Sequence, residues 1–123
     1  MKVISSKNAP AALGPYSQAI DTGSTLYVSG VLGIVPATGE LAGNTIEAQT
    51  EQVFKNIDAI LGEAGYAKES VVKCNVFLAD LNDFAACNKI YASYFGDHKP
   101  ARACVQAKMV KSAKVEIDVV AVK

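Results

Sequence analysis

The chain has 123 residues, of which 50% are apolar and 20% charged, and its formal net charge at pH 7 is zero. This length and composition predict one globular domain over residues 1–123, large enough to bury a core. The balanced charge, with lysines interspersed among acids, argues against a nucleic-acid-binding protein, because such proteins neutralise phosphates with a basic face.

Targeting and metal-binding signals are absent from the chain. Residues 1–7 lack the apolar stretch of a secretory signal, and no apolar run approaches the roughly 20 residues of a membrane span. Cys74, Cys87 and Cys104 are odd in number and lack CxxC spacing, so we expect neither a disulfide framework nor a zinc site. His98, the only histidine, is expected in a solvated loop. We expect a reducing compartment, by default the cytoplasm, and no membrane association.

Short apolar stretches between turn-forming residues predict strands in the first part of the chain. We place strands at 3–4, 18–20 and 26–29, with turns at 21–24 and 36–40. A helix is expected to begin at Asn44 or Thr45, with Glu47 forming a capping box with Asn44, and to end at Gly65. Apolar residues recur at helical spacing in it, namely Ile46, Val53, Ile57, Ile60, Leu61 and Ala64.

A strand over 71–79 is followed by a second helix, which Asp80 is expected to cap and Gly96 to end. This helix carries Phe84, Cys87, Asn88, Tyr91 and Phe95. Two strands, at 101–109 and 114–122, close the chain. The order βββ-α-β-α-ββ predicts an α+β fold, with a mixed six-stranded sheet and both helices on one face.

The last two strands alternate in polarity. Ala103, Val105 and Ala107 alternate with Arg102, Cys104, Gln106 and Lys108, whereas Val115, Ile117, Val119 and Ala121 alternate with Glu116, Asp118 and Val120. We expect the small apolar sets to face the helices and the polar sets to form the other face. Helices on one side leave that other face to solvent or to another subunit. We favour self-association, with polar groups lining an interfacial cleft.

Arginine occurs once, at Arg102, against eleven lysines. Arginine presents a planar fork of donors that matches both oxygens of a carboxylate or phosphate, whereas lysine suffices for a soluble surface. Arg102 is therefore either a dedicated anion-binding group or a surface residue selected by codon usage. Composition alone favours neither.

If the last two strands pair directly as an antiparallel unit, Arg102, Cys104 and Glu116 converge on the polar face. Burial between Val115 and Ile117 would raise the pKa of Glu116, and a nearby guanidinium would lower it. The alternative is a plain cross-strand ion pair. Cys104 has no histidine or helix N-terminus to make it a thiolate, so we interpret it as a packing or weak hydrogen-bonding residue rather than a nucleophile.

Five ordered segments resemble the signature blocks of the RidA/YjgF/UK114 family. They are Gly14–Ala19, Val28–Gly30, Phe84 with Asn88–Tyr91, Pro100–Arg102 and Val115–Ile117. The likeness runs essentially from end to end. Two departures occur: Val31 stands where the family often has Gln, and Met-Val-Lys-Ser at 109–112 replaces a frequent Leu-Pro-Lys-Gly turn. The first could alter the pocket wall, and the second is a loop change.

The resemblance implies chorismate-mutase-like subunits in a homotrimer, with clefts between neighbours. It also implies hydrolysis of reactive 2-imino acids, such as 2-iminobutanoate and 2-iminopropanoate, to 2-keto acids and ammonia, with no metal or cofactor. By that resemblance Arg102 clamps the substrate carboxylate and Glu116 holds the attacking water. It also implies that the site is shaped by Tyr16, Ser29, Gly30, Phe84, Asn88 and Cys104. A purely structural role stays open for each of these.

Two other functions stay open. A non-catalytic trimer could bind small 2-keto acids or related carboxylates through Arg102, without any need of Glu116. A ribonuclease or translation inhibitor, which has also been attached to this family, ranks lower. The chain lacks a basic patch, a histidine pair and stacking aromatic residues beside lysines.

Overall fold

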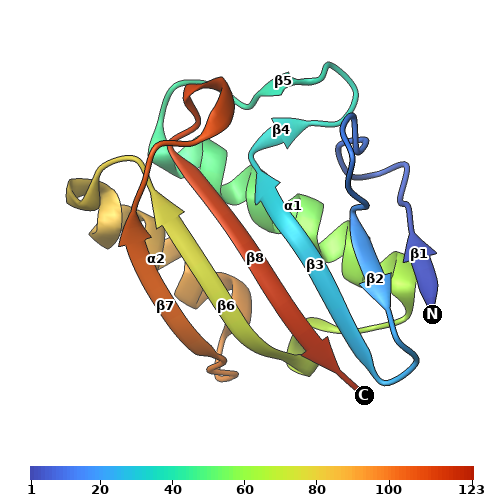
Figure 1. Ribbon diagram of the computed structural model, residues 1–123. Coiled ribbons are helices and arrows are strands. Elements are labelled where there is room, and N and C mark those ends of the chain that lie inside the picture. Colours follow the sequence, from blue (N-terminus) through green and yellow to red (C-terminus); the bar gives the residue numbers. More distant parts are fainter.

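Six strands form one sheet in the computed structural model, which describes residues 1–123, and two helices pack against one of its faces (Figure 1). The sheet consists of β1 (Lys2–Ile4), β2 (Ala19–Asp21), β3 (Thr25–Leu32), β6 (Val71–Leu78), β7 (Ala101–Gln106) and β8 (Val115–Val122). The strand order is β1-β2-β3-β8-β6-β7, and only β6 and β7 run parallel to each other. The predicted α+β fold with a mixed six-stranded sheet is confirmed.

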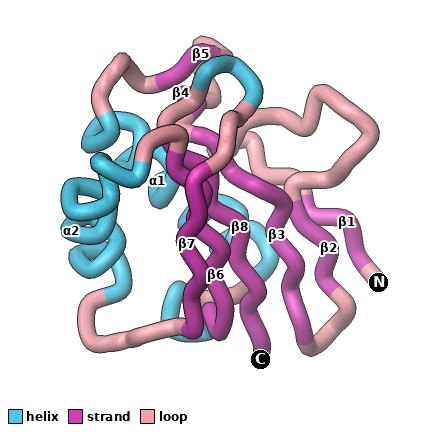
Figure 2. Tube along the Cα trace, turned by 60° about the vertical axis from the view of Figure 1, so that its left-hand side comes forward, coloured by secondary structure: helices cyan, strands magenta, loops and turns pink.

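Both helices, α1 (Ile46–Ala64) and α2 (Phe84–Phe95), lie on the same side of the sheet (Figure 2). The small hairpin of β4 (Ile34–Val35) and β5 (Glu40–Leu41) continues beyond β3 and contains the predicted turn. Three 3-10 turns complete the chain: η1 (Lys68–Ser70), η2 (Leu81–Asp83) and η3 (Val110–Ser112). No helix combines the length and the apolar character that crossing a bilayer requires.

Local sequence explains both ends of α1. Thr45 is the N-cap, and its hydroxyl accepts a hydrogen bond from the backbone N–H of Ala48 at 3.1 Å. The predicted capping box between Asn44 and Glu47 is wrong, because Glu47 lies at the second helical position instead of the third. Gly65 ends the helix in the left-handed conformation, with a φ of 76°, which residues with a Cβ rarely adopt.

The core lies between the helices and the sheet. In β8, Val115, Ile117 and Val119 are at most 1% exposed, and Glu116 and Asp118 alternate with them on the open face. The predicted orientation of this strand is confirmed. The buried apolar residues of α1 include Val53, Ile57, Ile60 and Leu61. They recur at the helical spacing expected of a helix that covers a sheet.

The orientation predicted for β7 is wrong. This strand lies at the edge of the sheet and pairs with β6, so β6 separates it from β8. Arg102 and Cys104 are in register with Cys74 and Val76, two buried residues of β6, and therefore face the helices. The alternate residues, among them Val105 at 48% exposed, face the open side. The β6-α2-β7 segment is a β-α-β unit, which pairs its strands in parallel.

Two buried amides of α1 fix the end of β3. Asn56 is fully buried, and its Nδ2 donates to the carbonyls of Leu32 at 3.0 Å and Ile34 at 2.9 Å. The Oε1 of Gln49 accepts from the N–H of Lys114 at 2.8 Å. These bonds tie backbone groups of β3, β4 and the residue before β8 to α1. They hold together the segments that surround the candidate site.

Helix α2 follows the turn η2. Asp80 caps η2 and not α2 itself, since its carboxylate accepts from the N–H of Asn82 at 2.8 Å. Gly96 ends α2 as predicted, with a φ of 63°. The expectation of a solvated His98 is wrong, because its ring nitrogen lies 2.5 Å from the carbonyl oxygen of Val71 in a half-buried position.

Candidate functional site

The segment between β1 and β2 folds over one end of the sheet, and the buried side chain of Gln18 holds it. The Oε1 of Gln18 accepts from the N–H of Ser6 at 2.6 Å. Its Nε2 donates to the carbonyls of Ser6 at 3.1 Å and Pro10 at 2.8 Å. One amide thus satisfies three backbone groups, which gives the segment a defined path.

Ser29 joins this segment to β3. Its hydroxyl donates to the carbonyl of Ser17 at 2.6 Å, and its N–H donates to the carbonyl of Gln18 at 3.0 Å. Tyr16 follows a tight turn, in which its N–H donates to the carbonyl of Gly14 at 2.8 Å. A Cβ at residue 14 would lie 3.0 Å from the Tyr16 ring. Glycine therefore lets the ring, which is 56% exposed, fold back over the turn.

A β-bulge in β3 makes room for the predicted base. Ser29 and Gly30 lie between the paired positions Val28 and Val31, whereas the facing segment of β8 has only one residue in between. The side chain of Glu116 lies against Gly30, where a Cβ would come within 2.8 Å of its Cδ. Ser29 and Gly30 thus form the bulge, which is one of the purely structural roles left open for them.

A cavity of about 610 Å³ opens beside this bulge, between the N-terminal segment, β3, β4 and η3. Its wall includes Tyr16, Ser29, Gly30 and Glu116, which we call the Glu116 half-site. Val31 also lines the cavity, so the first departure from the family pattern falls in the pocket wall. Val110 and Lys111 of η3 line it too, so the loop departure reaches the cavity as well.

Glu116 is half-buried in this wall. Burial raises the pKa of its carboxyl above the ordinary value of 4.5, and the nearby Asp118 carboxylate raises that pKa further. Asp118 is itself held by Asn75, whose Nδ2 donates to it at 2.9 Å. Within one chain no guanidinium lowers the pKa of Glu116, so burial decides the direction of its shift.

Arg102 places its guanidinium against α2. Its Nη1 donates to the Oδ1 of Asn88 at 2.6 Å. Its Cζ lies 4.7 Å from the ring centroid of Tyr91 and 5.5 Å from that of Phe84. Phe84, Asn88 and Tyr91 share one helix face because of their spacing. Arg102 is exposed, so the donors that do not bond Asn88 are left for a ligand. We call Phe84, Asn88, Arg102 and Cys104 the Arg102 half-site.

Cys104 packs against the edge of the core beside Arg102. Burial raises the pKa of its thiol, and the guanidinium of Arg102 opposes that rise only in part. A thiol with a raised pKa stays protonated near neutral pH and is a poor nucleophile. The interpretation of Cys104 as a packing residue is supported. No three His, Cys, Asp or Glu side chains come together as a possible metal site.

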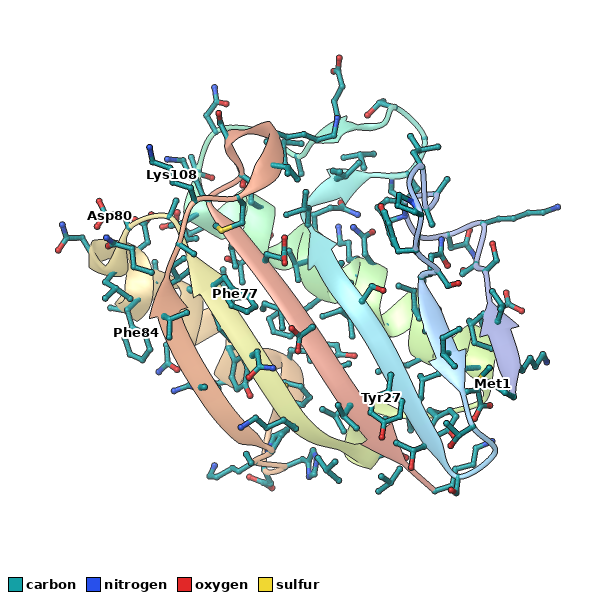
Figure 3. The ribbon with its side chains drawn as sticks, viewed as in Figure 1. Met1, Tyr27, Phe77, Asp80, Phe84 and Lys108 are labelled. Atoms are coloured by element: carbon teal, nitrogen blue, oxygen red, sulfur yellow. The ribbon has the colours of Figure 1, made fainter.

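The two half-sites do not meet within one chain. Glu116 is in register with Phe77 of β6, whereas Arg102 is in register with Cys74, so the two side chains project from opposite faces. Figure 3 shows Phe77 on β6 and Phe84 beyond the β7 edge. The convergence of Arg102, Cys104 and Glu116 expected from direct strand pairing is therefore wrong for a single chain.

Two residues beside the half-sites were missed in the sequence. Tyr91 was placed on the second helix without a role at the site, although it follows Asn88 by three positions and Phe84 by seven. That spacing places all three on one face and could have revealed it. Lys111 lines the cavity only because η3 turns back over it, and no local pattern signals this.

Comparison with known proteins places these residues in a family. The family model described as Endoribonuclease L-PSP matches residues 6–123. The mouse protein named 2-iminobutanoate/2-iminopropanoate deaminase is 45% identical over 123 residues, which span 99% of this chain and 91% of the mouse protein.

Solved structures point to the same family. A member of the conserved Rid protein family from Yersinia pestis has a TM-score of 0.96 at 48% identity, over 99% of this chain and 98% of that one. E. coli TdcF with bound serine has a TM-score of 0.96 at 38% identity, over 100% of this chain and 99% of that one. With a family model that covers nearly the whole sequence and relatives that match end to end, this chain belongs to the RidA/YjgF/UK114 family.

Proposed function

We propose that this protein hydrolyses small 2-imino acids to 2-keto acids and ammonia, in sites that join the Arg102 half-site of one chain to the Glu116 half-site of a neighbour. The mouse relative carries the name of this activity. The observation that carries the proposal is the division of the site residues into two incomplete groups on opposite faces of the sheet. Each group supplies what the other lacks.

The Arg102 half-site supplies an anion clamp. Asn88 accepts one N–H of the guanidinium at 2.6 Å and so fixes its plane. The remaining donors match the two oxygens of a carboxylate, a group that every 2-imino acid and 2-keto acid carries. The E. coli TdcF structure contains serine, which carries a carboxylate as well. A carboxylate held in this way presents its neighbouring carbon, C2, in a fixed direction.

The Glu116 half-site supplies a base. Glu116 accepts a proton from water while the water oxygen bonds to C2 of a protonated imine. The π electrons of the C=N bond pass to the nitrogen in this step. Glu116 then returns the proton to the nitrogen, and it takes up the hydroxyl proton as the C2=O bond forms, the C2–N bond breaks and ammonia leaves. A protonated imine is already a strong electrophile, so orientation and one base account for the chemistry. The raised pKa makes Glu116 a stronger base than a solvated glutamate.

Assembly of a homotrimer would bring the half-sites together. The open face of the sheet carries large apolar side chains, among them Val105 at 48% exposed and Tyr27 at 54% exposed, the latter labelled in Figure 3. Such a face is typical of a surface covered by another subunit. Two different surfaces meet in this contact, so it is heterologous, and copies joined by it form a ring when the rotation between them closes. Three copies is the number that the family resemblance implies.

Subunit mixing tests the shared site. Arg102→Ala and Glu116→Ala variants are each expected to be inactive alone. After unfolding and refolding together in equal amounts, about one site in four would combine an intact Arg102 with an intact Glu116 by random assortment. Recovery of a corresponding fraction of activity supports a site between chains. No recovery in mixed assemblies of verified stoichiometry would place the whole site in one chain and contradict the proposal.

The activity itself is tested with an imine that is generated in the assay mixture. An amino-acid oxidase supplies the 2-imino acid in the presence of a scavenger that competes for it, and keto-acid release is followed with and without this protein. Glu116→Gln separates the enzyme from the carboxylate-binding alternative. Loss of hydrolysis with retained 2-keto acid binding supports catalysis, whereas unchanged hydrolysis would show that Glu116 is not the base.

A further inference from the structure

We propose that Tyr91 is a positioning residue for Arg102, with its ring face supporting the guanidinium that binds substrate. The inference rests on the proposed function in that Arg102 is the group that holds the carboxylate. It assigns a role to a residue outside both half-sites. The ring, and not the phenolic hydroxyl, is the part that acts.

The geometry places the ring under the cation. The Cζ of Arg102 lies 4.7 Å from the Tyr91 ring centroid, closer than its 5.5 Å from Phe84. A guanidinium within about 6 Å of an aromatic centroid is attracted by the negative face of the ring. Asn88 holds one edge of the same guanidinium through its Nη1. The group is thus fixed at one edge and on its faces, and its other donors stay free.

Tyr91 is itself immobilised by other rings. Phe54 meets it edge-on at a centroid distance of 5.8 Å, and Phe95 lies 4.9 Å away. Tyr91 is 8% exposed. A ring clamped in this way gives the guanidinium a rigid support, so less side-chain freedom is lost when a carboxylate binds.

The hydroxyl of Tyr91 has no part in this support. Its oxygen is buried and makes no hydrogen bond of good geometry, and the side chain that interacts with it is the weakly polar thiol of Cys74. Such a group contributes little to the stability of the fold and carries a desolvation penalty. Replacing tyrosine by phenylalanine should therefore preserve the function of the ring, whereas leucine removes the aromatic face.

Arg102 can be observed directly, because it is the only arginine in the chain and gives a single arginine Nε–H signal in NMR spectra. We expect Tyr91→Leu to move this signal, through loss of the ring current, and to lower its heteronuclear NOE. Tyr91→Phe should leave both unchanged. The matched control is Tyr94→Leu, which removes a ring of the same helix that lies under Lys68 and not under Arg102.

Enzyme kinetics and ligand affinity provide a second test of the role of Tyr91. A cation–π contact of this kind predicts that Tyr91→Leu lowers kcat/KM and 2-keto acid affinity about 3- to 30-fold. Tyr91→Phe should have the kcat/KM and the 2-keto acid affinity of the wild type. In a protein that already carries Arg102→Lys, adding Tyr91→Leu should lower these two quantities little further. If Tyr91→Leu does not fold, 3,4,5-trifluorophenylalanine at position 91 keeps the ring size, weakens its negative face and is compared with Tyr91→Phe.

The outcomes separate the two proposals. An Arg102 signal unaffected by Tyr91→Leu, or shifted equally by Tyr94→Leu, overturns the role of Tyr91 whatever the enzyme does. If Tyr91→Phe changes the Arg102 signal and kcat/KM as much as Tyr91→Leu does, the effect belongs to the hydroxyl, and the proposed role of the ring is overturned. Absence of imine hydrolysis by the wild type removes the proposed function, while the NMR arm still decides whether the ring positions Arg102.

Discussion

The side chain of Glu116 lies in the space that a Cβ at Gly30 would need. That Cβ would stand 2.8 Å from the Cδ and 3.2 Å from the Cγ of Glu116. Gly33, three residues on, has the same kind of restriction for a different reason, since its Cβ would lie 2.9 Å from the Cα of Gln49. One glycine is adjacent to a flexible side chain, and the other to the backbone of a helix.

Gly30→Ala should therefore impair activity and spare the fold. The carboxylate of Glu116 can swing away at little cost, but it then no longer holds water over the substrate. We expect kcat/KM to fall about tenfold or more, on the scale of a misplaced catalytic group. Unfolding temperature should change little. Steady-state kinetics and calorimetry on the same preparation measure the two effects.

Gly33→Ala is the matched control. The backbone of α1 cannot move aside locally, so overpacking should reduce the free energy of unfolding by about 1–3 kcal/mol. If Gly30→Ala lowers stability as much as Gly33→Ala does, the adjacency of Gly30 and Glu116 has a structural role and not a catalytic one.

Arg102→Lys should fail nearly as badly as Arg102→Ala. An ammonium keeps the positive charge but lacks the planar fork and stacks less well on the rings of Phe84 and Tyr91. Loss of charge-assisted bonds worth about 1.5–3 kcal/mol each corresponds to a fall in kcat/KM of roughly 10- to 150-fold. Wild-type activity in the lysine variant would show that charge alone is sufficient and would contradict the bidentate clamp.

The pH profile should carry the signature of Glu116. Its pKa is raised by burial, so the neutral acid persists to higher pH than for a solvated glutamate. The base is present only above that pKa. We expect kcat/KM to rise with pH through an acid limb whose midpoint lies above 4.5.

A substrate or oxidase that titrates in the same range could mimic this limb. Glu116→Gln provides the control, because its residual activity should lose the limb and become flat with pH. A limb that persists in Glu116→Gln would assign it to another group.

Strain in η3 predicts a stabilising substitution. Lys111 and Ser112 both have positive φ, 61° and 54°, a region that costs a non-glycine residue roughly 1–2 kcal/mol. Ser112→Gly should raise the free energy of unfolding, by about 0.5–1 kcal/mol after the entropy of glycine in the unfolded chain is subtracted. Chemical denaturation at fixed protein concentration measures this change.

Ser93→Gly supplies the opposite case. Ser93 is exposed in the interior of α2, so glycine there should be destabilising by about 0.5–1 kcal/mol relative to a residue with a side chain. If both serine-to-glycine variants lose stability, the positive φ of Ser112 is not a source of strain.

Much of the fold could be predicted because its causes are local. Thr45 and Gly65 bound α1 through a side-chain cap and a left-handed residue. Alternation in β8 assigned Val115, Ile117 and Val119 to the core. Each of these follows from contacts within a few residues. The capping box failed by one position, which is the usual scale of uncertainty at a helix end.

The face of β7 could not be read from alternation. Ala103 and Val105 are the more apolar set, yet they face the open side, and Arg102 and Cys104 face α2. An edge strand that a helix covers only in part can turn a polar set toward that helix. The crossover through α2 pairs β7 in parallel with β6, and this pairing sets the face of the strand against its side-chain polarity.

The sequence by itself determined which residues are candidates for the chemistry, because a lone arginine and a glutamate between apolar neighbours are visible as residue types and spacings. Only the tertiary structure decided that Arg102 and Glu116 are kept apart. The insertion of β6 between β7 and β8 is a long-range choice, made by the crossover through α2 and by burial of the sheet under both helices. Strand order depends on contacts between distant residues, and no local pattern encodes it.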